Sequence, residues 1–236
     1  MKSISRVALC LFALVTLVGC ASTKVTSSQS YLGQKLARPD RIIVHDFAVT
    51  PADIPSWSAS ASQYAAPSTP QTAEAIAVGR KLGAQVAKEL VAEIREMGLP
   101  AVLAAGQPSP RVGDIVLIGY FASIDKGSAA KRVAIGFGSG GAKLTTQLEG
   151  YLMTDQGLRE LGSREIDSGG GGKTPGVMVP LAVTIATKNP IGLIVGGAVK
   201  VGGEVTGKST IEGSAKRTAK KIGDELRVAF GEQGWL

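Results

Sequence analysis

The sequence predicts an α/β protein of the α+β kind, in which one mixed sheet of about four to five strands is packed by a central helix and a long C-terminal helix. Three observations lead to this fold class. Apolar runs rich in β-branched residues lie at 41–49 and 114–124, helical periodicity covers 70–97 and 210–230, and a hairpin pattern covers 144–166. Elements in this order favour one sheet with helices packed on it.

The first strand is predicted at 41–49, where the apolar run is bounded by Pro39 and Pro51. Such a run is typical of a buried strand. The following residues, 50–70, contain four prolines together with many serines and alanines. This composition predicts a long surface loop that is poorly ordered in part.

A helix is predicted from Pro70 to Met97. Thr69 is a suitable N-cap residue, proline is favoured at the first helical position, and Gly98 followed by Pro100 ends the helix. Its predicted inner face carries small and apolar residues at steps of three or four. These residues are Ile76, Gly79, Gly83, Val86, Leu90, Ile94 and Met97.

Three further strands are predicted after this helix, together with a short one at 101–105 that precedes them. The continuous apolar character of 114–124 indicates burial on both faces. Residues 144–152 alternate between apolar and polar or aromatic side chains, as in a half-exposed strand. Asp155–Gly157 is then a turn, and 158–166 returns as the second strand of a hairpin.

The C-terminal part is expected to begin with a glycine-rich helical segment at 176–207, followed by an amphipathic helix at 210–230. Four-residue glycine steps let two helix backbones approach closely. They suit packing inside the protein, self-association or contact with a membrane surface. The candidate helix-packing glycines are Gly192, Gly196, Gly203 and Gly207.

The N-terminus has the pattern of a secretory signal peptide. Lys2 and Arg6 precede an apolar run at 7–18, which is too short to span a bilayer as a helix. The run closes in Leu17-Val-Gly-Cys20, a pattern that resembles the lipobox of bacterial lipoproteins.

The lipobox resemblance implies that residues 1–19 are the signal peptide, with cleavage between Gly19 and Cys20. It also implies palmitate-type acyl chains on Cys20, of which two or three anchor a protein stably. Because Ala21 follows, it further implies the outer membrane, with the protein facing the periplasm. Residues 20–38 are expected to form a lipidated tether, and 39–236 the periplasmic α/β domain.

The composition excludes some partners. The formal charge of +7 falls to +5 without Lys2 and Arg6, and the remaining basic residues are scattered among acidic ones. Nucleic acid is therefore not expected as a partner. Cys10 would leave with the signal peptide and Cys20 would be acylated, so no intramolecular disulfide is expected.

The segment Gly202-Gly-Glu-Val-Thr-Gly-Lys-Ser209 matches the P-loop formula. An exported protein has no ATP pool, and the motif is followed by only about 27 residues, which leaves no room for later strands with a magnesium-binding Asp. Glycines at four-residue steps are explained equally well by helix packing. Neither a nucleotide nor another cofactor is expected.

No catalytic or metal-ligating residue is expected. His45 is the only histidine, whereas metal sites usually draw on several His or Cys ligands. Asp46, its neighbour on a strand, would point to the opposite face, which disfavours a Ser-His-Asp triad. We interpret His45 as a packed, structural residue. Counting alone does not exclude a carboxylate pair of the glycosidase type, for which the candidates are Asp114, Asp125, Glu149 and Asp155.

A further resemblance rests on five segments, which are Ile42–Phe47, Gly79–Met97, Gly113–Gly119, Arg132 with Gly136-Phe-Gly-Ser-Gly140, and Gly213–Ala219. Together they resemble a family of bacterial lipoproteins that carry the domain of unknown function 4410. This family has no assigned activity. The order of elements is also similar to the periplasmic domain of the curli secretion channel and to the first domain of the Tol-system periplasmic protein. These similarities imply an assembly or interaction module.

The sequence therefore favours a lipid-anchored envelope lipoprotein that is not an enzyme and acts as a structural or binding module on the periplasmic side of the outer membrane. Its expected partners are the membrane, through the N-terminal lipid, and an unknown envelope protein or a second copy of the chain. Two alternatives stay open. One is an envelope hydrolase or carbohydrate-processing enzyme, and the other is an accessory subunit of a secretion or assembly complex.

Overall fold

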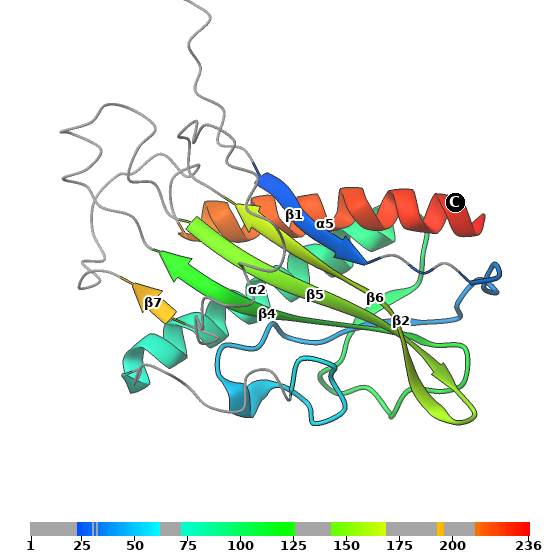
Figure 1. Ribbon diagram of the computed structural model, residues 1–236, viewed down its shortest axis with the longest axis horizontal. Coiled ribbons are helices and arrows are strands. Elements are labelled where there is room, and N and C mark those ends of the chain that lie inside the picture. The colour runs from blue at the N-terminus through cyan, green and yellow to red at the C-terminus, as the bar shows by residue number, and fades with distance from the viewer. Residues whose placement is uncertain are drawn as a thin grey trace, which may run out of the picture.

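The computed structural model describes residues 23–29, 31, 33–61, 72–125, 143–168, 193–195 and 211–236. In chain order its elements are β1 Thr23–Gln29, β2 Ile42–Val44, the 3₁₀ turn η1 Pro51–Asp53, α2 Ala73–Glu96, β3 Ala101–Leu103, β4 Ile115–Asp125, β5 Lys143–Thr154, β6 Gly157–Ser168, β7 Leu193–Val195 and α5 Ile211–Gln233. They form one mixed sheet with two long helices, so the predicted α+β class is confirmed (Figure 1).

The sheet has the strand order β1-β6-β5-β4-β2-β3, and β7 pairs with β4. The strands β1, β6, β5 and β4 are antiparallel neighbours, whereas β2 is parallel to both β3 and β4. β2 pairs only with the first residues of β4, and β7 pairs with its last ones. The long strand β4 is therefore hydrogen-bonded at both ends on its β2 side.

Two of these strands differ from the expected assignments. β1 lies within the segment 20–38 that was expected to be a tether, and β7 lies within the segment 176–207 that was expected to be helical. The backbone of β1 pairs with the outer edge of β6, and the backbone of β7 pairs with the end of β4 that β2 does not reach. Hydrogen bonding to an unpaired sheet edge is a tertiary effect, which local composition does not reveal.

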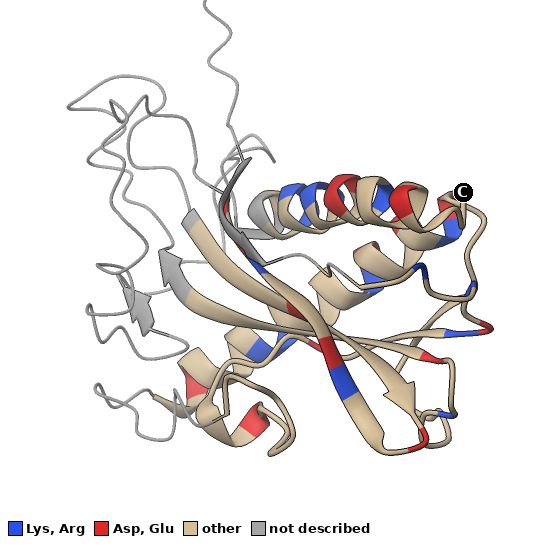
Figure 2. Ribbon diagram, turned by 45° about the vertical axis from the view of Figure 1, so that its right-hand side comes forward, with Lys and Arg blue, Asp and Glu red and all other residues tan. Residues whose placement is uncertain are grey.

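Both helices pack on the same face of the sheet, where they enclose the main core (Figures 1 and 2). The predicted inner face of α2 is confirmed for its central residues: Gly79, Gly83, Val86, Leu90 and Ile94 are buried. The helix begins later than predicted, because Thr72 rather than Thr69 is its N-cap. The Thr72 hydroxyl accepts a hydrogen bond from the Ala75 N–H at 3.2 Å, which satisfies a donor of the first turn.

Phe47, just after β2, determines how closely α2 and β4 approach each other. A Cβ atom on Gly83 would lie 2.2 Å from the Phe47 carbonyl oxygen, and one on Gly119 would lie 2.1 Å from the Phe47 ring. The Phe47 N–H donates to the Gly83 carbonyl at 3.3 Å. The two glycines are thus required by contact with one aromatic residue.

The other face of the sheet is covered by the segment 50–61, which was expected to be part of a surface loop. Ile54 packs there against Ala48 and Tyr120. Glu149 and Tyr151, on the β5 face expected to be half exposed, are only 1% and 3% exposed. The prediction of a half-exposed strand was therefore wrong at these two residues, because the segment 50–61 covers them and supplies polar partners, whereas Thr145 and Gln147 on the same face are partly exposed.

Leu36, in the segment between β1 and β2, meets the C-terminal residues beside the end of α5. The Leu36 N–H donates to Gln233 Oε1 at 2.7 Å, and Trp235 Nε1 donates to the Leu36 carbonyl at 3.0 Å. Basic and acidic residues both occur along α5 (Figure 2), where Lys220 pairs with Asp224 and Lys221 with Glu225. Within the described ranges, neither helix has the run of apolar residues that a membrane-spanning helix needs.

Candidate functional site

The candidate site is a hollow of about 340 Å³ where β2 and β3 end. In open sheets, the carboxyl ends of parallel strands are a common location for ligand sites. The residues that follow β2 and β3 contribute to the lining, together with one residue each of η1 and α2. The lining residues are His45, Asp46, Phe47, Ala48, Asp53, Arg80, Ala104 and Ala105.

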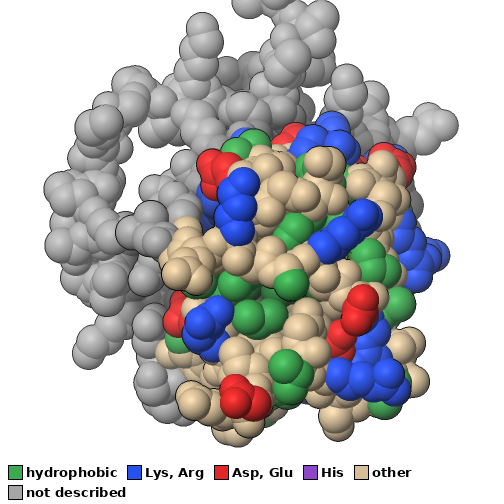
Figure 3. All heavy atoms as spheres, turned by 90° about the vertical axis from the view of Figure 1, so that its right-hand side faces the viewer, with side chains coloured by type: hydrophobic (Ala, Val, Ile, Leu, Met, Phe, Trp, Pro, Cys, Tyr) green, Lys and Arg blue, Asp and Glu red, His purple; other side chains and the backbone are tan. Residues whose placement is uncertain are grey.

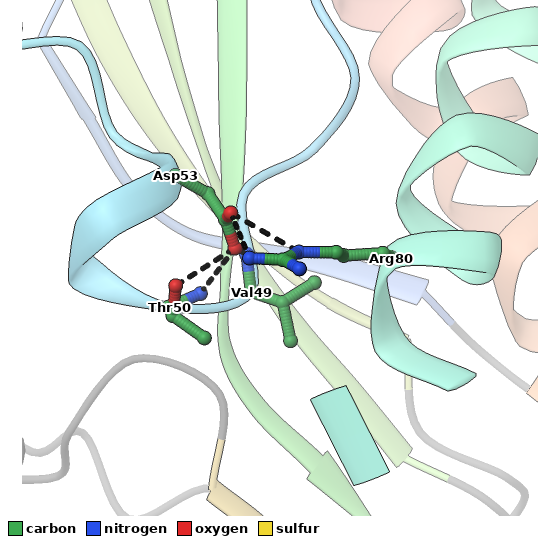
Figure 4. Close-up of polar contacts among 4 residues, drawn as sticks. All are labelled: Val49, Thr50, Asp53 and Arg80. Atoms are coloured by element: carbon green, nitrogen blue, oxygen red, sulfur yellow. Dashed lines mark hydrogen bonds and ion pairs between the residues drawn. The ribbon is translucent and has the colours of Figure 1, made fainter. Parts of the chain in front are cut away.

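An ion pair between η1 and α2 lies at this hollow (Figure 4). Arg80 donates to Asp53 Oδ1 through Nε at 3.1 Å and through Nη2 at 2.7 Å. The other carboxylate oxygen, Oδ2, accepts from the Thr50 hydroxyl at 2.9 Å and the Thr50 N–H at 3.0 Å. Both oxygens of Asp53 are therefore engaged.

The electrostatics of Asp53 follow from these contacts. Burial by itself would raise the pKa of its carboxyl, but the hydrogen bonds from Arg80 and Thr50 outweigh it, and the pKa lies below the ordinary value of 3.8. The side chain is ionised at neutral pH and is already satisfied by protein donors. Its geometry suits fastening η1 to α2 rather than proton transfer.

His45 is half-buried, and its ring meets the Trp57 ring edge-on, with 6.0 Å between the ring centres. Burial lowers the pKa of the imidazole, and the charge of Asp46 offsets part of this effect. The residue is therefore neutral at pH 7. β2 ends at Val44, so the expected strand alternation stops there, and His45 and Asp46 both line the hollow.

A second polar cluster lies under the segment 50–61. The Glu149 carboxylate accepts hydrogen bonds from the hydroxyls of Ser58 and Tyr151, both at 2.6 Å, and from the Ser60 hydroxyl. The Ala59 N–H donates to the Tyr151 oxygen at 2.8 Å. Glu149 and both serines are buried, so this cluster holds the segment on the sheet and is closed to substrate.

No pattern in the sequence predicts this cluster. Burial first, and the hydrogen bond to Glu149 second, raise the pKa of Tyr151 above its ordinary value of 10. The features of the sequence that could have indicated it are a carboxylate within the largely apolar β5 strand and a serine-rich loop elsewhere in the chain. Pairing these two segments requires knowing that residues some 90 positions apart meet in space.

The four candidate carboxylates lie in different parts of the fold's elements. Asp114, before β4, accepts from Arg41 Nε at 3.0 Å, whereas Asp125 ends the same strand. Glu149 belongs to the buried cluster, and Asp155 is exposed in the β5–β6 turn. Within the described residues, no group of three His, Cys, Asp or Glu side chains is placed to hold a metal ion.

Other sequence-predicted site residues lie outside the described residues. They are Gly19 and Cys20, the P-loop-like segment 202–209, and the glycines Gly192, Gly196, Gly203 and Gly207. Of the segment around these glycines, the structure describes only Leu193–Val195, which forms the strand β7. The helix-packing role of the four glycines stays a prediction.

The chain is similar in sequence to a known family and in part of its fold to solved structures. No curated protein matches it. A PelC dodecamer from Paraburkholderia phytofirmans that carries a leucine-to-methionine substitution is 16% identical, with a TM-score of 0.37, and the match covers 70% of this chain and 90% of that one. Another PelC dodecamer structure from the same organism is 14% identical, with a TM-score of 0.36, covering 70% and 91%. At these values the likeness carries no argument about function.

The family evidence is of a different kind, because it covers more than half of the chain. The family described as "Domain of unknown function (DUF4410)" matches residues 42–187. The match begins at β2 and includes α2, both clusters described above and the β5–β6 hairpin. The resemblance noted in the sequence is thereby confirmed: this chain belongs to the DUF4410 family.

Proposed function

We propose that this protein is a lipid-anchored, non-catalytic module of the bacterial envelope, held by Cys20 at the periplasmic side of the outer membrane. The observation that carries the proposal is the apolar run 7–18 ending in Leu17-Val-Gly-Cys20. Such a run is too short to span a bilayer, but it has the arrangement of a signal peptide that ends at a modified cysteine.

The position of β1 supports a close attachment. β1 begins at Thr23, only three residues after Cys20, and pairs with Ser168 at the end of β6. Three residues of extended chain span about 10 Å. Acyl chains on Cys20 would therefore hold this end of the sheet close to the lipid headgroups, and the β5–β6 turn would point away from them.

The state of the polar side chains supports a binding or structural role. Asp53 and Arg80 neutralise each other, Asp114 binds Arg41, and Glu149 is enclosed by hydroxyls of its own chain. These groups stabilise contacts between elements. His45 and Asp46 remain at the hollow, which is suited to binding a small polar group.

The test is membrane attachment of the full chain with Cys20→Ser. We expect this variant to lose its acyl chains and to leave the membrane fraction, measured by fractionation and by mass spectrometry of the N-terminal peptide. Cys10→Ser is the matched control, since it changes the other cysteine of the chain and should remain anchored. A Cys20→Ser protein that stays in the membrane fraction as the parent does would disprove the anchor.

A further inference from the structure

The hollow where β2 and β3 end has the size of a ligand site and a lining of unequal charge. Its volume of about 340 Å³ falls within the range of small-molecule sites, which is about 300–1,000 Å³. The charged residues of the lining are Asp46, Asp53 and Arg80, and its alanines are Ala48, Ala104 and Ala105. Two carboxylates and one guanidinium give the lining an excess of formal negative charge.

The unbalanced charge belongs to Asp46. Arg80 binds one oxygen of Asp53 and Thr50 binds the other, so this ion pair is neutral and already satisfied (Figure 4). Asp46 is exposed, and among the described residues its carboxylate forms neither an ion pair nor a hydrogen bond. A group that enters the hollow therefore meets one carboxylate whose charge no neighbouring cation neutralises.

His45 offers a second acceptor in the same hollow. Its ring is half-buried and is held by the edge-on contact with Trp57. In the part of the chain that the structure describes, no hydrogen bond engages the ring nitrogens. A neutral imidazole has one ring nitrogen that accepts a hydrogen bond. A carboxylate and an imidazole that line one hollow suit a cation that carries more than one N–H donor.

A metal ion fits this set of acceptors less well than an organic cation does. Within the described ranges, no three His, Cys, Asp or Glu side chains are placed around a common point, and one carboxylate with one imidazole falls short of a zinc or calcium site. A primary ammonium group has three N–H donors and no acceptor. It therefore matches two acceptors on a lining with excess negative charge.

We propose that this hollow binds a small primary amine, whose ammonium group donates hydrogen bonds to Asp46 and His45 and whose carbon atoms lie against the alanines. A dissolved amine and the ethanolamine head group of a phospholipid share this chemistry. The inference names the ligand class for the binding role proposed above and rests on that role. It does not rest on the anchor at Cys20, because the residues of the hollow all lie within the described ranges.

The test is a proton NMR titration of the full chain with Cys20→Ser. His45 is the only histidine, so its ring proton signals report on the hollow without ambiguity. We expect ethanolamine to shift these signals saturably in the millimolar range, since so small a ligand makes few contacts. Tetramethylammonium has the same charge but no N–H donor, and at equal concentration it should cause no saturable shift.

Asp46→Asn should weaken ethanolamine binding roughly tenfold, the effect of losing a hydrogen bond to a charged group. Ala105→Leu places a larger side chain in the hollow and should also weaken binding. Asp40→Asn is the matched control, because it removes the same charge from another exposed residue, just before β2. β2 begins toward the end of the molecule that Figure 3 views, where charged side chains of both signs are spread over the surface. This control should bind as the parent does.

Flotation with vesicles distinguishes the two sources of the amine. Stronger association with phosphatidylethanolamine than with phosphatidylcholine, abolished by Asp46→Asn, assigns the lipid head group, whereas equal association assigns the dissolved amine.

Three results would overturn the proposal. One is the absence of a saturable shift with ethanolamine, and another is an equal shift with tetramethylammonium. The third is unchanged binding by Asp46→Asn and by Ala105→Leu, each shown by circular dichroism to be folded. None of these results depends on whether Cys20 is acylated, so they are distinguishable from failure of the anchor.

Discussion

Thr146 and Thr218 each bury a side-chain hydroxyl group in the protein interior. Both lie at 0% exposure, and within the described part of the chain their hydroxyls make no hydrogen bond. Thr146 is on β5 and Thr218 is on α5, so each is in an element that contributes to the main core. Burying an unpaired hydroxyl costs about 1–3 kcal/mol by mutational measurements.

We therefore predict that Thr146→Val stabilises the protein by about 1 kcal/mol, because a methyl group replaces a hydroxyl that has no partner. The free energy of unfolding in urea measures this change. Thr145→Val is the matched control on the neighbouring, partly exposed position and should change the stability by less. A lower stability for Thr146→Val would show that the hydroxyl is satisfied after all.

His45 gives the protein a pH-dependent stability. Its pKa in the folded state lies below the ordinary value of 6.5, so the unfolded chain binds the proton more readily. Stability is then complete above the unfolded-state pKa and decreases as the pH falls below it. We predict that the free energy of unfolding decreases between about pH 7 and pH 5.5.

His45→Asn should make this pH dependence flatter, since His45 is the only histidine of the chain. Urea unfolding at several pH values is the measurement. An equally steep decrease in the variant would assign the effect to other groups. The pKa of Glu160, which burial raises, acts in the opposite direction, because a carboxyl with a raised pKa favours folding at lower pH.

At the scale of elements, the segment 50–61 is the part whose attachment depends on few contacts. The hydroxyls of Ser58 and Ser60 donate to the Glu149 carboxylate, and the Ala59 N–H donates to the Tyr151 oxygen. Asp53 forms an ion pair with Arg80 on α2. Ile54 is its buried apolar side chain. Hydrogen bonds from these two hydroxyls to the buried Glu149 carboxylate therefore provide much of the attachment of this segment to β5.

We predict that Ser58→Ala lowers the free energy of unfolding by about 1.5–3 kcal/mol, the range for hydrogen bonds to charged groups. It should also make residues 50–61 more sensitive to limited proteolysis. Ser56→Ala changes an exposed serine of the same segment and should affect neither property. Equal protease resistance of the Ser58 variant and the parent would show that Ile54 and Asp53 suffice to hold the segment.

At the scale of the whole molecule, residues close to both ends of the chain complete the domain. Leu36 and Trp235 are 199 positions apart and share a hydrogen bond beside α5, and Trp235 is 5% exposed. β1, which precedes Leu36 by a few residues, pairs with β6 and so closes that edge of the sheet. The fold therefore depends on segments that lie outside the family match at 42–187.

We predict that Trp235→Ala destabilises the protein by about 3–5 kcal/mol, the usual cost of deleting a buried tryptophan side chain. Thermal and urea unfolding measure the loss. Leu236→Ala, at a neighbouring residue that is 52% exposed, is the control and should be nearly neutral. A loss below 1 kcal/mol for Trp235→Ala, outside the usual range, would mean that the ends of the chain contribute little to the domain.

Much of the fold could be predicted because its main elements have strong local patterns. The residues from Ile115 to Phe121 are buried throughout, as their continuous apolar run indicates, and α2 buries the face that its periodicity predicts. The β5–β6 turn lies at Asp155 and Gln156, as its composition suggests. In each case the signal and the structure it specifies lie within one short segment.

The polar clusters could not be predicted, because their members come from distant segments. Ser58 meets Glu149, Asp53 meets Arg80 and Gly150 meets Gly162 only when the sheet has formed and its register is set. β7 is a still clearer case, since an apolar glycine-rich sequence suits a helix or a strand, and the open edge of β4 selects the strand.

The sequence by itself determined the α+β class, the main strands and helices, the family and the cysteine on which the proposed anchor depends. Periodicity and apolar runs suffice for the fold class and its elements because they act over a few residues, whereas the family and the cysteine follow from resemblance to known motifs. Tertiary structure alone decided which polar groups are satisfied inside the protein, which edges of the sheet are closed and which residues face each other across neighbouring strands. Those outcomes depend on which distant residues come into contact, and that is settled only when the whole chain packs.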